Sequence, residues 1–297
     1  MIAPQSTPLR PQSTVLHRHA APASRFLLVV NKGPGAVRIA REGKAWDLME
    51  ILFTAEDIEA VQRNPAASDA DHVVFETDRR MRKFSTFRRV LERYPQFDAY
   101  QAIFLCDDDL LPVGCSVADI FEQFMLTGFR IGQPALTRDS YWSHEIVLQD
   151  PRFRWRITNF VEVMCPLMTL AALRDYMPVF GETISNFGLD NYWSAREWEL
   201  HGGLVILDST PVRHVRPVRG GLAYRGVQAD AERLAFFNKH RLRNYRHLTL
   251  GGEPSVPGAS VGGLPISYRS QIRDRLKFGL KRTVRRALSS LLPNFYA

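Results

Sequence analysis

The chain has 297 residues, of which 45% are hydrophobic and 24% are charged, and this is the composition of an ordinary globular protein. No apolar run approaches the ~20 residues that a membrane-spanning helix needs. The net charge of +8 is uneven: residues 268–297 hold eight basic residues and one acidic residue, a net +7, so residues 1–267 carry +1. A nearly neutral body argues against nucleic acid binding by the whole protein.

The first 24 residues are rich in Pro, Ser, Gln and Ala and lack the apolar stretch of a secretory signal. We expect this extension to be disordered, because it has little to bury. The three cysteines, Cys106, Cys115 and Cys165, show no C-x-x-C spacing. An odd count without a signal peptide predicts a cytoplasmic protein with free thiols.

Apolar runs and helical spacing alternate along the body of the chain. Strands are predicted over residues 26–30, 46–53, 71–77, 100–105, 129–135, 141–148, 155–163 and 204–207. Helices are predicted over residues 79–93, 117–126, 167–176 and 188–200. Strands that alternate with helices predict an α/β domain with a mostly parallel sheet, which we place at residues 25–250.

The C-terminal part differs from this body. Residues 251–267 are dominated by Gly, Pro, Ser and Val and predict a flexible linker. Residues 268–297 then place apolar side chains on one side of a helix and most of their cations on the other. A basic amphipathic helix on a linker is typical of an anchor to an anionic membrane surface. A solvated tail, or a helix docked on a partner, is the alternative.

The most informative stretch is YQAIFLCDDDL, residues 100–110, in which a buried strand runs into three carboxylates. Alternate side chains of an extended chain point the same way, so Asp107 and Asp109 are predicted to share a crevice while Asp108 points away. Carboxylates that converge repel each other, and a divalent cation such as Mg²⁺ or Mn²⁺ would relieve the repulsion and bind phosphates. An acidic turn after a core strand is the alternative interpretation.

Further polar residues follow other predicted strands. The first strand runs into Asn31, Lys32 and Gly33, a loop placed to meet a nucleotide, although a plain tight turn is equally compatible. Glu162 is a carboxylate within an otherwise apolar strand, and Asp190 opens a helix, where an ionised carboxylate is favoured. His214 follows the last buried strand by seven residues.

Six segments, in this order, resemble the metal-dependent GT-A glycosyltransferases, and more narrowly an uncharacterised family of glycosyltransferases in plants and bacteria. They are YQAIFLCDDDL (100–110), IGQPAL (131–136), HEI (144–146), FVEVMCP (160–166), FGLDNYW (187–193) and VILDSTPVRHVRPVRGG (205–221). The resemblance implies the GT-A fold, with a mostly parallel central sheet, helices on both faces and a short mixed second sheet. The plant pattern has a longer insertion between HEI and FVEVMCP, which puts the identity of the acceptor in doubt.

The resemblance also implies roles for individual residues. Asp107, Asp109 and His214 would bind Mn²⁺ or Mg²⁺, and Asp190 would deprotonate the acceptor hydroxyl in an inverting reaction. Contacts to the nucleotide-sugar donor would come from Asn31, Lys32, Asp78, Lys83 and Asp108. The acceptor side would be lined by Glu162, His144 and Trp193. A hydrogen-bonded strand carboxylate is an equally compatible interpretation of Glu162, and a core histidine is one of His144.

The predicted activity is therefore a hexosyltransferase-type reaction from a nucleotide-diphosphate sugar, with a UDP-sugar favoured, to a hydroxyl of a glycan or lipid-linked acceptor. We expect it in the cytoplasm, on the inner face of the membrane if the C-terminal helix is an anchor. Three alternatives stay open. One is a Mg²⁺-dependent phosphohydrolase, although the first strand lacks the Asp nucleophile that this class uses. The second is a non-catalytic nucleotide-sugar or glycan-binding protein of the same fold. The third is a nucleic-acid-binding protein that works through its basic C-terminal tail.

Overall fold

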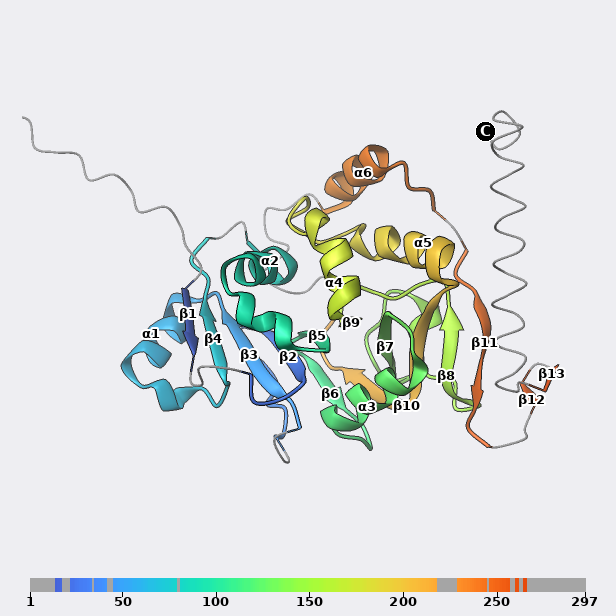
Figure 1. Ribbon diagram of the computed structural model, residues 1–297, viewed down its shortest axis with the longest axis horizontal. Coiled ribbons are helices and arrows are strands. Elements are labelled where there is room, and N and C mark those ends of the chain that lie inside the picture. Colours follow the sequence, from blue (N-terminus) through green and yellow to red (C-terminus); the bar gives the residue numbers. More distant parts are fainter. Residues whose placement is uncertain are drawn as a thin grey trace, which may run out of the picture.

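We analysed a computed structural model of the chain (Figure 1). It describes residues 14–17, 22–33, 35–41, 45–78, 81–217, 229–244, 246–256, 260–261 and 264–265. The predicted C-terminal helix lies outside these residues. So does the N-terminal extension, except for residues 22–24 and residues 14–17, which we expected to be disordered but which form a strand. Among the described residues, no helix has both the length and the apolar character to cross a membrane.

An eleven-stranded sheet forms the body of the protein. Its order is β1-β4-β3-β2-β5-β9-β7-β10-β8-β11, and β6 pairs with β10 beside this path. The strands are β1 (Thr14–His17), β2 (Phe26–Lys32), β3 (Asp47–Leu52), β4 (His72–Phe75), β5 (Ala102–Asp107), β6 (Leu110–Pro112), β7 (Ile131–Leu136), β8 (Phe153–Thr158), β9 (Leu167–Thr169), β10 (Leu204–His214) and β11 (Thr249–Pro254). A separate antiparallel pair consists of β12 (Ser260–Val261) and β13 (Leu264–Pro265).

Strand direction gives the sheet two distinct edges. β4, β3, β2 and β5 are mutually parallel, and β7 is parallel to β10. The short strand β9 is antiparallel to both β5 and β7, so these two strands point the same way. Six strands therefore finish at one edge, which we call the carboxyl edge, and begin at the opposite, amino edge. The strands β1, β8 and β11 are antiparallel to their neighbours, so the predicted α/β class is confirmed with a mixed sheet.

Helices cover both faces of the sheet, because alternate residues of the central strands pack into two separate cores. Phe26, Leu28 and Val30 of β2 face the core that α1 and α3 cover, and Leu27 and Val29 face the other. The helices are α1 (Ala55–Arg63), α2 (Lys83–Arg93), α3 (Val117–Thr127), α4 (Leu170–Tyr176), α5 (Leu189–His201) and α6 (Ala229–His240), with short 3₁₀ turns at Pro65–Ala67, Pro95–Ala99, Glu145–Val147 and Met177–Val179. Figure 1 shows α2, α4, α5 and α6 together on one side of the sheet.

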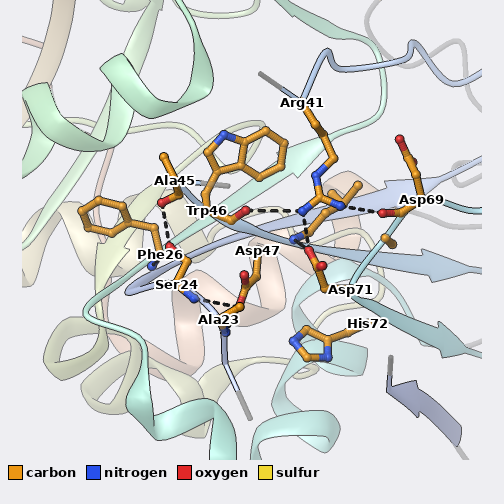
Figure 2. Close-up of polar contacts among 12 residues, drawn as sticks. Ala23, Ser24, Phe26, Arg41, Ala45, Trp46, Asp47, Asp69, Asp71 and His72 are labelled. Atoms are coloured by element: carbon orange, nitrogen blue, oxygen red, sulfur yellow. Dashed lines mark hydrogen bonds and ion pairs between the residues drawn. The ribbon is translucent and has the colours of Figure 1, made fainter. Parts of the chain in front are cut away.

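The amino edge is closed by a hydrogen-bonded cluster (Figure 2). Asp47 accepts from the Tyr100 hydroxyl at 2.6 Å and from the Ala23 amide at 2.9 Å, and the Tyr100 hydroxyl also contacts His72 Nε2 at 3.0 Å. Nearby, Arg41 donates to Asp71 at 2.5 Å. These bonds join the starts of β3 and β4 to the residues that precede β2 and β5.

Several predicted elements differ from the observed ones. Residues 141–148 were predicted as a strand but form a loop with one 3₁₀ turn, and the Tyr141 amide donates to the backbone carbonyl of His214, the last residue of β10, at 3.1 Å. The predicted helix over residues 167–176 begins with the three residues of β9. Residues 251–254, predicted as the start of a linker, belong to β11, where they pair with β8. The strand predicted over residues 204–207 continues to His214 as β10.

Candidate functional site

The three consecutive aspartates lie at the carboxyl edge, as the sequence predicts. Asp107 ends β5 and pairs in register with Asn31 near the end of β2. Leu110 then begins β6, so Asp108 and Asp109 form the turn between two strands. The three side chains differ in their partners, although Asp108 and Asp109 share Arg216.

Asp107 is held by Lys83, the first residue of α2. The Lys83 ammonium donates to Asp107 Oδ1 at 2.7 Å and to the carbonyls of Val163 and Met164 at 2.8 Å each, with Leu105 O at 3.3 Å. The Lys83 side chain is 3% exposed, whereas that of Asp107 is 43% exposed. Lys83 was predicted to contact the nucleotide, but its three donor hydrogens are already directed at these four acceptors. It fixes Asp107 at the opening of the site.

Asp108 turns toward the loop after β2 instead of away from the site. Its Oδ2 accepts from the Gly33 amide at 2.7 Å, and its Oδ1 accepts from the Arg216 guanidinium. Burial raises the pKa of Asp108 above its ordinary value, although the Gly33 amide and the charge of Arg216 act in the opposite direction. The predicted outward orientation of Asp108 is therefore wrong, because the Gly33 amide and Arg216 supply partners on the inner side.

Asp109 meets His214 across the pairing of β6 with β10. His214 lies opposite Leu110 in this antiparallel pair. The register of β10 against β7 shifts between Leu207 and Val212, and on its other side β10 pairs first with β8 and then with β6. His214 Nε2 is 3.0 Å from Asp109 Oδ2, and Arg216 Nε donates to the same oxygen at 2.9 Å. Asp109 Oδ1 is buried and has no hydrogen-bond partner among the described residues.

The orientation of His214 is fixed on both sides of its ring. Nδ1 lies 2.6 Å from the Tyr141 carbonyl, which only accepts, so Nδ1 carries a hydrogen and Nε2 is the nitrogen that faces Asp109. Burial opposes a positive charge on His214, but the hydrogen bond and the charge of Asp109 outweigh it and raise the imidazole pKa. Burial alone would raise the pKa of Asp109, yet His214 and Arg216 hold it below its ordinary value. Without a metal, this is a charge-assisted pair.

Glu162 adds a buried carboxyl group from the segment between β8 and β9. It is 4% exposed, and its Oε2 has no partner within the described part of the chain. Its backbone amide donates to Gln133 Oε1 at 2.6 Å. Burial raises the pKa of Glu162 to about 8, with further contributions from the negative charges of Asp190 and Asp107. Glu162 is therefore protonated at neutral pH and lies within electrostatic range of both aspartates.

Asp190 lies in the first turn of α5, which begins after Gly188 at a φ of 95°. A side chain at position 188 would place its Cβ 2.9 Å from Phe236 of α6, so glycine is needed there for both its conformation and its small size. Burial raises the pKa of Asp190 to about 6, while backbone amides that include that of Asn191, at 2.8 Å, favour its ionised form. Asp190 therefore combines an ionised ground state with substantial basicity.

The groups around Asp109 fit a divalent cation in kind. Asp109 Oδ1 is a buried oxygen without a partner, and a metal-binding histidine commonly donates its other ring N–H to a backbone carbonyl, as His214 does to Tyr141. Within the described residues, however, no three Asp, Glu, His or Cys groups already form a metal-binding cluster. Asp109 and His214 are in contact, but Asp107 is held by Lys83 and Arg216 lies against Asp109.

The remaining predicted donor residues lie near this edge. Asn31 Oδ1 is buried and unpartnered among the described residues, and Lys32 pairs with Glu50 at 3.2 Å. Asp78 is buried before α2, 3.6 Å from a guanidinium nitrogen of Arg89. Asn31 is thus the member of this set with an unused buried oxygen facing the end of β5.

Of the predicted acceptor-side residues, Trp193 is corrected by the structure. It is fully buried, its indole N–H donates to the Val161 carbonyl at 2.9 Å, and it packs in the core beside Phe84. A helix that packs against the sheet turns this face of α5 inward, so Trp193 supports the Glu162 segment and does not line a site. His144 is half-buried, 4.6 Å from the Phe160 ring centroid, and burial lowers its pKa to about 4.

Arg216 and Tyr141 are site residues that the sequence interpretation missed. Arg216 is two positions beyond His214 in HVR, and alternation along a strand would have placed both side chains on the same side. The contact of Tyr141 with His214 is made by its backbone carbonyl, for which the sequence carries no signal. The Tyr141 and Trp142 side chains are nearly half exposed beside this contact, at 48% and 45%.

Comparisons with known proteins find only weak structural likeness. No family model matches the chain, and no curated protein matches its sequence. A crystal structure of A197 from STIV has a TM-score of 0.34 and 12% identity, covering 65% of this chain and 86% of that one. A 4-diphosphocytidyl-2C-methyl-D-erythritol synthase from Anaerococcus prevotii DSM 20548 has a TM-score of 0.35 and 9% identity, covering 71% of this chain and 95% of that one. The resemblance to GT-A glycosyltransferases therefore stays a prediction.

Proposed function

We propose that the protein is a metal-dependent glycosyltransferase that moves a sugar from a nucleotide-diphosphate donor to a hydroxyl group of a glycan or lipid-linked acceptor. The observation that carries the proposal is the contact of Asp109 with His214, residues that are 105 positions apart in the chain. Around this contact, Asp107 of the same acidic turn interacts electrostatically with Glu162 and His214, and Glu162 also with Asp190, so two further segments contribute carboxyl groups. An acidic site at the carboxyl edge of an α/β sheet suits a cation and a diphosphate.

The ligands of the cation would be Asp109 and His214, joined by Asp107 once its contact with Lys83 is shared or released. A divalent cation in this place would act as a Lewis acid that stabilises the negative charge of the leaving diphosphate. Lys83 and the Gly33 amide keep Asp107 and Asp108 in place at the opening of the site. Asn31 contributes a further oxygen at the same edge.

The acceptor side of the reaction would belong to Asp190 and Glu162. As the acceptor oxygen bonds to the anomeric carbon, its hydroxyl proton passes to the Asp190 carboxylate, and the bond from the sugar to the diphosphate breaks. Attack from the face opposite the leaving group inverts the anomeric configuration. Glu162, which is protonated at neutral pH, would orient the acceptor by a hydrogen bond, because its Oε2 has no partner among the described residues.

The direct test is to incubate the protein with a panel of UDP-, GDP-, CDP- and ADP-sugars and Mn²⁺, with and without glycan acceptors. Release of the nucleoside diphosphate that requires both the protein and the cation supports the proposal. Release of inorganic phosphate from simple phosphate esters would favour a phosphohydrolase instead. Binding of the nucleotide sugar without any turnover, including hydrolysis, would favour a non-catalytic binding protein.

A further inference from the structure

Arg216 contacts Asp108 and Asp109, the two buried residues of the acidic turn Asp107–Asp109. Its guanidinium donates to Asp109 Oδ2 through Nε at 2.9 Å and to Asp108 Oδ1 through Nη2. The side chains of these aspartates are only 11% and 12% exposed, whereas that of Arg216 is 39% exposed. A cation that reaches two buried carboxylates from the solvent side can leave them without disturbing the core.

The position of Arg216 conflicts with a metal ion on Asp109. A divalent cation at this carboxylate would repel the guanidinium, and removal of Arg216 would leave the negative charge of Asp108 less compensated. The unpartnered Asp109 Oδ1 shows that the carboxylate retains capacity for another ligand even while Arg216 is present. A diphosphate bound next to the metal would offer the guanidinium a new partner, since its planar set of donors matches phosphate and carboxylate oxygens equally well.

We infer that Arg216 is a diphosphate-binding residue that competes with the divalent cation for Asp109 in the absence of nucleotide and moves to the phosphates when the nucleotide binds. The inference rests on the proposed function, because it requires a site for a cation and a nucleoside diphosphate. Its consequence is positive coupling: the cation alone binds weakly, and the diphosphate raises the affinity of the cation.

This role predicts opposite effects on two affinities. Arg216→Gln removes the competing charge, so Mn²⁺ alone should bind about 3–10-fold more tightly. The same substitution removes a charge-assisted bond to the phosphates, so UDP in saturating Mn²⁺ should bind about 10–100-fold more weakly. A purely structural role would weaken both affinities together. Arg216→Lys retains the charge but not the two-pronged geometry. Its affinities for Mn²⁺ and for UDP should therefore lie between those of the wild type and those of Arg216→Gln.

The experiment measures Mn²⁺ binding by isothermal titration calorimetry and by the electron paramagnetic resonance signal of free Mn²⁺, and UDP binding by calorimetry, on the full chain. Arg213→Gln is the matched control. Arg213 lies three positions before Arg216, near the end of β10. Its side chain is 46% exposed and pairs with Asp139 at 3.6 Å. It should leave both affinities within about twofold of the wild type. Thermal melting of each variant identifies any loss of folding, and Arg216→Lys replaces Arg216→Gln if the latter does not fold.

Opposite shifts in Arg216→Gln, absent in Arg213→Gln, support the inference. Equal shifts in one direction, or no shift, overturn it, and the proposed function stands if the wild type still releases UDP from a UDP-sugar with Mn²⁺. A wild-type protein that binds neither Mn²⁺ nor UDP, nor any other nucleoside diphosphate tested with Mn²⁺, and that turns over no nucleotide sugar overturns both.

Discussion

The two edges of the sheet each carry a polar cluster, and the clusters differ in how completely their atoms are paired. The amino-edge cluster comprises Asp47, Tyr100, His72, Asp71 and Arg41, and Figure 2 labels all of these except Tyr100. The carboxyl-edge cluster comprises Asn31, Lys83, Asp107, Asp108, Asp109, Glu162, Asp190, His214 and Arg216. Among the described residues, buried side-chain atoms without a partner include Asn31 Oδ1, Asp109 Oδ1 and Glu162 Oε2, and none belongs to the amino-edge cluster.

This difference separates a structural cluster from a candidate site. A buried polar atom without a partner costs about 1–3 kcal/mol of folding free energy, so such atoms are rare unless something else requires them. At the amino edge, the hydrogen bonds connect segments of the fold. Among the described residues, no buried side-chain atom of this cluster lacks a partner. At the carboxyl edge, the unpaired atoms come from different segments: Asn31 pairs in register with Asp107, and Glu162 interacts electrostatically with it. The Asp107 side chain is 43% exposed. We therefore expect substitutions at the carboxyl edge to affect activity and those at the amino edge to affect stability.

The largest effect should follow from loss of the carboxylate that faces His214. Asp109→Ala is expected to reduce Mn²⁺-dependent release of the nucleoside diphosphate by about 10³-fold or more, because charge stabilisation of the leaving group is lost. Asp107→Ala should act in the same direction. The measurement is initial rate against Mn²⁺ concentration with the most active nucleotide sugar. Asp139→Ala, an exposed carboxylate that pairs with Arg213, is the control and should retain the rate. Full activity in Asp109→Ala would contradict the site assignment.

The substitution Asp190→Asn should have the next largest effect on activity. The amide cannot take the proton of the acceptor hydroxyl, so transfer should fall by about 10²–10⁴-fold while UDP binding stays within about twofold. Rate and calorimetric affinity are measured on the same preparation. Glu197→Gln, a second buried carboxyl group on α5 that accepts from Tyr176 at 2.8 Å, is the matched control and should retain transfer. Transfer at the wild-type rate in Asp190→Asn would show that another group is the base.

At the amino edge the expected effect is on folding. Asp47→Ala leaves the Tyr100 hydroxyl and the Ala23 amide without their acceptor, and should lower the free energy of unfolding by about 2–4 kcal/mol. Activity per folded molecule should not change. Urea unfolding gives the free energy. Asp69→Ala is the control because its side chain is 48% exposed and forms a surface pair with Arg38. A stable but inactive Asp47→Ala would remove the distinction between the edges.

The sequence predicts the two edges unequally well. The acidic turn, Asn31 and Asp190 all lie where strands end or a helix begins, so the alternation of strands and helices places them at one edge. The contact of His214 with Asp109 was predicted only through family resemblance. It depends on the bulge in β10 and on the three residues of β6, and neither feature has a distinctive residue pattern.

Other parts of the site could not be predicted because tertiary contacts decide them. A lysine at the start of a helix is expected to be exposed. The ammonium of Lys83 is instead buried, and it donates to the carbonyls of Val163 and Met164, about 80 positions away in the chain. Trp193 was assigned to the site through the segment FGLDNYW, but the packing of α5 on the sheet buries it in the core. The strand predicted over residues 141–148 has aromatic and β-branched residues. Its backbone instead forms hydrogen bonds with His214 at Tyr141 and a 3₁₀ turn at Glu145–Val147.

The smallest predicted effect tests whether the unpaired carboxyl group of Glu162 weakens the fold, as the comparison of the edges implies. Its folded pKa of about 8 lies above the ordinary 4.5, so the folded state retains a proton that the unfolded state releases. Stability from this group is complete below pH 4.5 and is lost as the pH rises toward 8. Glu162→Gln does not titrate at position 162, so its free energy of unfolding relative to the wild type should rise by about 2 kcal/mol between pH 5 and pH 7. A full proton difference would give about 1.4 kcal/mol per pH unit, and incomplete ionisation reduces this value.

Urea unfolding at both pH values measures this difference, and the exposed Glu145→Gln should show no change with pH relative to the wild type. A difference that is flat or falls with pH would mean that Glu162 is already ionised in the folded protein, and then its Oε2 would need a cation that the described residues do not supply.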